Sequence, residues 1–139
     1  MEIGLALSGG GIRAAVFHLG VLRRLADEGL LESVTEVSTV SGGSLAMAAL
    51  MSKAGMQWPR SADYRDRLYS ELRALLTTSD LFSFKAIGWA GLIRFNHHLL
   101  SQRARVLAEL LVTRWGIDGA IRDLPVRPVW WINATCLET

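Results

Sequence analysis

The chain has 139 residues, half of them hydrophobic, and a formal net charge of +2. This length fits one domain with a substantial core, and so hydrophobic a composition excludes a disordered chain. The small excess of positive charge gives no reason to expect nucleic acid as a partner. Its single cysteine, Cys136, cannot form an internal disulfide, and no cluster of ligand residues predicts a metal or another cofactor.

Short apolar runs alternate with helical patterns in the first 55 residues. A short run bounded by serine and glycine favours a buried strand, and apolar residues three or four apart favour a helix. The predicted order is a strand over 3–7, a helix from Arg13 to Gly29, a strand over 35–40 and a helix over 44–53. This alternation predicts a parallel sheet covered by helices. Both glycine turns would lie at the carboxyl edge of the strands, where ligands gather.

The remainder of the chain has a mostly helical pattern. Two apolar stripes predict helices over 61–76 and 101–116, the first with Ser61 as its N-cap. Residues 128–135, PVWWINAT, return to a strand pattern because Val, Trp and Ile crowd them. No repeat or linker divides the sequence, so one domain is the simplest account.

Residues 81–95, LFSFKAIGWAGLIRF, carry four aromatic side chains and two charges. Two interpretations stay open: burial as a core helix or lid, and peripheral contact with a membrane surface. No stretch reaches the roughly 18 apolar residues of a membrane span, and the N-terminus lacks the basic start of a signal peptide. We therefore expect a cytoplasmic protein that at most visits a membrane surface.

The second glycine turn holds a candidate nucleophile. The stretch TVSGGS lies between a predicted strand and a predicted helix, as the G-x-S-x-G motif of serine hydrolases does. Ser41 takes the position of the nucleophile, Gly43 that of the last glycine, and Thr39 replaces the first glycine. Taken alone, the stretch fits an ordinary strand-to-helix connection with a serine cap equally well.

The first glycine turn, SGGGIR, offers the complementary chemistry. Acyl transfer through a serine creates an oxyanion, which needs preorganised N–H donors. Consecutive glycines permit the positive φ angles of a nest of backbone N–H groups. The candidate oxyanion and substrate-binding residues are Gly9, Gly10, Gly11, Gly42 and Arg13. The arginine either steadies the loop or attracts an anionic headgroup.

A non-catalytic or dinucleotide-binding α/β domain is the alternative. Gly9, Gly11 and Ala14 also fit the G-x-G-x-x-G/A fingerprint, and Glu32 is the acid expected about 20 residues later. Glu32, however, precedes the second strand, and the fingerprint leaves VSGGS unexplained. A P-loop is excluded because no Gly-Lys-Ser/Thr follows the glycines.

Two segments, LSGGGIRAAVFHLGVLRRL and VSTVSGGSLAMAAL, resemble the oxyanion and nucleophile segments of the patatin-like phospholipases, and NATCLET resembles a later strand of that family. The resemblance implies a three-layer α/β/α domain with a mainly parallel sheet, of which residues 1–139 form an N-terminal part. It also implies a serine lipid acyl hydrolase, similar to phospholipase A or lysophospholipase, that needs no cofactor. Ser41 would attack a lipid or phospholipid ester with the help of a catalytic aspartate.

In the family this aspartate lies in an Asp-Gly pair after the NAT-like strand. The one such pair here, Asp118 and Gly119, precedes that strand, so we interpret it as a turn. The resemblance therefore implies a catalytic aspartate beyond Thr139, in sequence that completes the domain.

A histidine is a weaker candidate than an aspartate for the general base that takes the proton of Ser41. His97 and His98 lie in the apolar region without a clear acid partner, so we assign them surface or capping roles. His18 falls on the first predicted helix and is interpreted as a packing residue.

Overall fold

The computed structural model describes residues 1–78 and 103–135. In chain order its elements are β1 (Ile3–Leu7), α1 (Gly11–Asp27), η1 (Leu31–Ser33), β2 (Val34–Val40), α2 (Gly42–Lys53), α3 (Ser61–Asp63), η2 (Tyr64–Leu68), α4 (Tyr69–Thr78), α6 (Arg103–Trp115), η3 (Ile121–Asp123) and β3 (Val129–Asn133). Each strand and helix predicted for the first 55 residues is present, with a boundary shift of at most two residues. Residues 61–78 form one helical stretch, α3–η2–α4, as the apolar stripe predicted.

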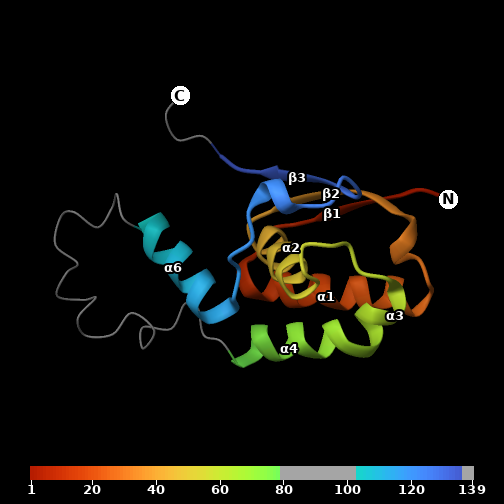
Figure 1. The fold of residues 1–139 in the computed structure, drawn as a ribbon, viewed down its shortest axis with the longest axis horizontal. Coiled ribbons are helices and arrows are strands. Elements are labelled where there is room, and N and C mark those ends of the chain that lie inside the picture. The colour runs from red at the N-terminus through yellow and green to blue at the C-terminus, as the bar shows by residue number, and fades with distance from the viewer. Residues whose placement is uncertain (79–102, 136–139) are drawn as a thin grey trace.

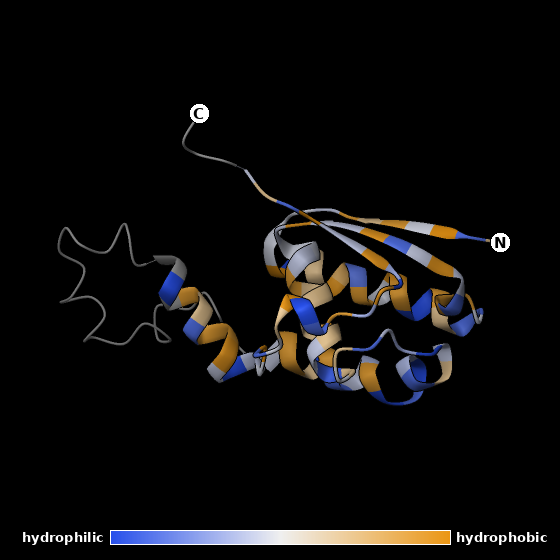
Figure 2. Ribbon diagram, turned by 45° about the horizontal axis from the view of Figure 1, so that its top comes forward, coloured by the Kyte–Doolittle hydropathy of each residue, from blue (hydrophilic) through white to orange (hydrophobic). Residues whose placement is uncertain are grey.

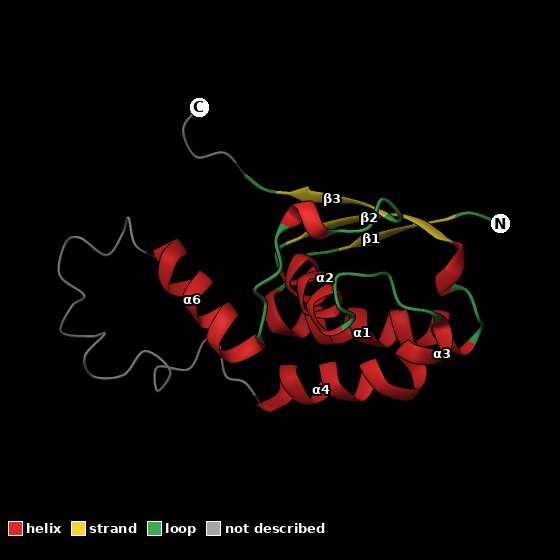
Figure 3. Ribbon diagram, viewed as in Figure 1, coloured by secondary structure: helices red, strands yellow, loops and turns green. Residues whose placement is uncertain are grey.

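The three strands form a parallel sheet in the order β1-β2-β3. Leu7 at the end of β1 pairs with Thr39, and Val40 at the end of β2 pairs with Asn133. Figure 1 shows α1, α2, α3 and α4 beneath one face of this sheet, and Figure 3 shows the loops that join them to the strands. The predicted α/β class with a parallel sheet is confirmed; within the described residues, the helices cover one face of it.

The core lies between the sheet and these helices. Side chains alternate along a strand, so near the ends of the strands Leu7, Val37 and Thr39 are buried, whereas their neighbours are more exposed. Figure 2, coloured by hydropathy, shows apolar segments both in the strands and in the helices beneath them. Burying a large apolar side chain stabilises the fold by roughly 1.5–3 kcal/mol. The fully buried side chains from α1, α2 and α4 include Leu19, Leu22, Met47, Leu50 and Leu72.

Three helices end at a glycine, and the sequence predicts each of these ends. Gly29, Gly55 and Gly116 adopt φ angles of 68°, 65° and 66° just after α1, α2 and α6. Each is followed by a residue whose N–H donates back to a carbonyl of the last helical turn. Glycine adopts this left-handed conformation without a Cβ penalty.

Ser61 is not an N-cap, so that prediction was wrong. The helix begins at Ser61 itself, after Arg60. Both the N–H and the hydroxyl of Ser61 donate to the carboxylate of Glu32, 29 residues earlier. Glu32 therefore supplies the cap acceptor from another part of the fold.

Several predictions fall on residues outside the described ranges. They are the choice between burial and membrane contact for residues 81–95, and the roles of His97 and His98.

Candidate active site

The two glycine turns lie side by side at the carboxyl edge of the sheet. Ser8 and Gly9 follow β1, and Ser41 follows β2, whose last residues pair with the end of β1. A Cβ placed on Gly9 would lie 3.3 Å from the Cβ of Ser41 and 3.8 Å from its Oγ. The first glycine of the triplet therefore lies directly beside the candidate nucleophile, in space that a larger side chain would fill.

Ser41 has a backbone conformation that is rare for a residue with a side chain. Its φ and ψ angles are 51° and −115°, and α2 begins directly after it. A strained conformation of this kind costs of order 1–3 kcal/mol and is typical of functional sites. The Ser41 side chain makes no capping hydrogen bond to α2, and the residue is exposed. The Ser41 hydroxyl therefore lies at the positive end of a twelve-residue helix without capping it.

The two glycines after Ser41 let α2 pass close to the first turn. A Cβ on Gly42 would overlap the carbonyl oxygen of Gly11, and a Cβ on Gly43 would overlap the carbonyl oxygen of Leu7. Both neighbours are backbone atoms, which cannot move aside as a flexible side chain would. Gly42 and Gly43 therefore bring the nucleophile turn and the glycine triplet together.

The glycine triplet has the conformation that its sequence predicts. Gly10 and Gly11 adopt φ angles of 135° and 64°, both in the region that favours glycine. Arg13 lies in the first turn of α1 with an exposed side chain. Within residues 1–78 and 103–135 it forms no ion pair, so its guanidinium is free to meet an anion.

Thr39 fits in place of the usual glycine because its side chain enters a buried polar cluster. Thr39 is 1% exposed, and its Oγ1 lies 2.9 Å from the Oγ of Ser44 and accepts a hydrogen bond of 2.8 Å from Trp130 Nε1. Asn133 of β3 donates to the Thr39 carbonyl oxygen at 3.1 Å. Two side chains of β3 therefore brace the strand end that carries Ser41.

His18 is buried, as its interpretation as a packing residue predicted. It also donates a hydrogen bond from Nε2 to the carbonyl oxygen of Ser8, at 3.0 Å. Neither this bond nor the cluster around Thr39 was predicted from the sequence. A polar residue on an otherwise apolar helix face was the one available signal for it.

The alternative dinucleotide fingerprint lacks its acid at the required place. Glu32 lies in η1, before the amino end of β2, and its carboxylate accepts two hydrogen bonds from Ser61. The ribose-binding acid of that fingerprint belongs near the opposite end of the strand. Asp118 and Gly119 lie in the irregular loop between α6 and η3.

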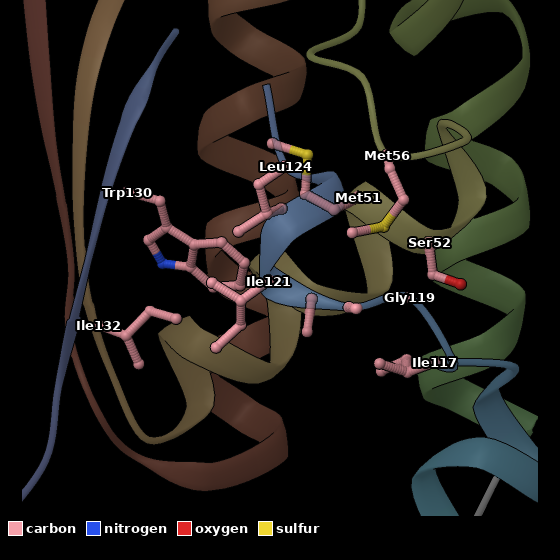
Figure 4. A pocket seen from close by; sticks show the side chains of 11 residues that line it. Met51, Ser52, Met56, Ile117, Gly119, Ile121, Leu124, Trp130 and Ile132 are labelled. Atoms are coloured by element: carbon pink, nitrogen blue, oxygen red, sulfur yellow. The ribbon is translucent and has the colours of Figure 1, made fainter. Parts of the chain in front are cut away.

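An apolar cavity of about 130 Å³ lies between α2, the loop after α6 and β3. Figure 4 shows Trp130 and Ile132 extending into it from β3, opposite Met51 of α2 and near Met56. Neither Ser41 nor the glycine triplet lines it. The cavity is thus distinct from the two glycine turns, although Trp130 touches both Thr39 and the cavity.

No helix in the described part of the chain is both long and apolar enough to cross a membrane.

Comparison with known proteins identifies the family. The family model described as patatin-like phospholipase matches residues 5–112. Cytosolic phospholipase A2 gamma of Homo sapiens is 40% identical over 60 residues, which are 43% of this chain and 11% of the relative. Its Mus musculus counterpart is 48% identical over 48 residues, or 34% of this chain and 8% of the relative. The chain thus matches about a tenth of the length of these relatives, and no solved structure matches it. The family model covers both glycine turns and most of the chain, and the chain therefore belongs to the patatin-like phospholipase family.

Proposed function

We propose that this chain carries the nucleophile and oxyanion part of a serine lipid acyl hydrolase that cleaves acyl esters of lipids or phospholipids. The observation that carries the proposal is the position of Ser41 beside Gly9. A strained serine whose hydroxyl is not used for capping lies beside a glycine turn that is rich in backbone N–H groups. The phospholipase family model and the phospholipase A2 relatives support the lipid substrate class.

In the proposed mechanism, Ser41 Oγ attacks the ester carbonyl carbon while its proton passes to an aspartate beyond residue 139. Backbone N–H groups of Gly9, Gly10 and Gly11, with Gly42, stabilise the oxyanion. The alcohol then leaves with the proton from the aspartate, and an acyl-enzyme remains on Ser41. A water molecule gives one proton to the same aspartate and attacks the acyl-enzyme. The bond to Ser41 Oγ then breaks, the aspartate returns that proton to Oγ, and the fatty acid is released.

The proposal also assigns a role to Arg13 and a location to the protein. The exposed guanidinium of Arg13, two residues after the glycine triplet, attracts an anionic lipid headgroup. We infer a cytoplasmic protein that meets its substrate by peripheral contact with a membrane, since the relatives are named as cytosolic phospholipases.

The test uses the full-length protein and a fluorophosphonate probe, which modifies activated serines. We expect labelling at Ser41 and hydrolysis of a fatty acyl ester, both lost in Ser41→Ala, with a fall in rate on the order of 10³–10⁶. Ser70→Ala, a change at an exposed serine of α4, is the matched control and should leave both unchanged. A Ser41→Ala protein that turns over normally would remove the proposal.

A further inference from the structure

His18 is a buried titratable residue that the proposed mechanism does not use. It is 4% exposed, and its Nε2 lies 3.0 Å from the carbonyl oxygen of Ser8. Because a carbonyl oxygen only accepts hydrogen bonds, Nε2 must carry the proton and donate it. The Ser8 hydroxyl lies farther from the same nitrogen, at 3.5 Å. The shorter bond therefore links the second turn of α1 to the residue that precedes the glycine triplet.

The carbonyl that His18 holds belongs to the same peptide unit as the N–H of Gly9. A peptide unit is planar and trans, so its C=O and N–H point in opposite directions. Fixing the Ser8 carbonyl toward His18 therefore also fixes the direction of the Gly9 N–H. Gly9 is the residue of the triplet that lies beside Ser41. Its peptide unit would otherwise flip easily, because glycine adopts φ angles of either sign.

We propose that His18 is a positioning residue, which orients the Gly9 N–H as an oxyanion donor beside Ser41. The inference rests on the proposed function of Ser41. Hydrogen bonds in series also polarise one another, by roughly 10–30% per bond. Donation from His18 to the Ser8 carbonyl therefore makes the Gly9 N–H a stronger donor. The imidazole exchanges no proton with substrate and acts on the reaction only through this peptide unit.

A matched pair of variants in the full-length protein tests the inference. His18→Gln and His18→Met have side chains of equal length and similar volume, but only glutamine offers an N–H where Nε2 lies. We expect His18→Met to lower kcat for ester hydrolysis about 10- to 100-fold with little change in KM, which is part of the 10²–10³ lost with a whole oxyanion donor. His18→Gln should stay within about threefold of wild type. The rate of fluorophosphonate labelling should follow kcat, and thermal unfolding should be similar for both variants.

Three results would overturn the inference. One is equal kcat in His18→Gln and His18→Met with both proteins folded, because packing alone would then account for His18. Another is a wild-type protein whose Ser41 does not label, which removes the proposed function and the inference with it. If both variants fail to fold, nitrogen NMR of the wild-type imidazole decides. A protonated Nε2 with a protected proton upholds the bond to Ser8, and a neutral ring protonated only at Nδ1 rejects it.

Discussion

Gly42, the first residue of α2, lies directly against the carbonyl oxygen of Gly11, the first residue of α1. The two helices that leave the two glycine turns thus touch through backbone atoms. This close approach is what places the Ser41 hydroxyl next to the glycine triplet.

Gly42→Ala should disturb this contact. The added Cβ would overlap a backbone oxygen, so one turn must shift at a cost of about 1–3 kcal/mol. Chemical denaturation should show the loss, and fluorophosphonate labelling of Ser41 should slow as the turns separate. Gly20→Ala is the control, since a Cβ at this exposed position of α1 meets no atom within 4 Å. It should raise stability by about 0.5–1 kcal/mol, because alanine favours the helix. Equal stability and equal labelling rates in the two variants would contradict the prediction.

The strain at Ser41 predicts that removing the nucleophile stabilises the protein, provided that glycine replaces it. Glycine adopts the φ of 51° found at this position without the penalty that a side chain brings. Ser41→Gly should therefore be about 1 kcal/mol more stable than Ser41→Ala, although both lose labelling. Thermal unfolding of the two variants measures the difference. A less stable Ser41→Gly would show that this conformation is not strained.

The polar cluster around Thr39 predicts that two similar substitutions of this residue differ in their effect on stability. Thr39→Val keeps the shape of the side chain but leaves the indole N–H of Trp130 without its acceptor. An unsatisfied buried donor costs about 1–3 kcal/mol, so this variant should unfold at lower denaturant concentration. Thr39→Ser keeps the hydroxyl and should lose less. Equal stability of the two variants would exclude the hydrogen bonds as the reason for a threonine here.

Glu32 predicts a pH-dependent contribution to stability. Hydrogen bonds from the Ser61 hydroxyl and N–H hold the pKa of Glu32 below its ordinary value. A lowered pKa in the folded state contributes stability above the unfolded pKa of about 4.3, and the contribution is lost as pH falls through the folded value. At pH 7, Glu32→Gln should be destabilised by about 1 kcal/mol, a modest figure because the residue is exposed.

The deficit of Glu32→Gln should shrink as the pH is lowered from 7 to about 3. Glu36→Gln, at an exposed position of β2 whose side chain makes no hydrogen bond in the described part of the chain, is the control. A deficit that is constant across this pH range would contradict the assignment.

Features that depend on neighbouring residues were predictable from the sequence. Gly29, Gly55 and Gly116 end helices because a left-handed residue is needed at each position, and the nearby sequence shows that need. The pairing of the two glycine turns also followed, because the strand–helix alternation places both at one sheet edge.

Features that depend on distant residues were not predictable. Ser61 looks like a cap until Glu32 is known to lie beside it. The partner of Thr39, Trp130, is 91 residues away in the chain. His18 and Ser8 are separated by ten residues, but their bond depends on how the glycine loop folds back over α1. No local pattern contains this information, because each of these contacts forms only when the sheet and helices have packed.

The position of β3 has a practical consequence for producing this protein. β3 pairs with β2 alone among the described strands, and its Trp131 and Ile132 are 57% and 48% exposed. An unpaired strand edge with apolar side chains is a template for β-aggregation. The protein should therefore self-associate through β3 at high concentration.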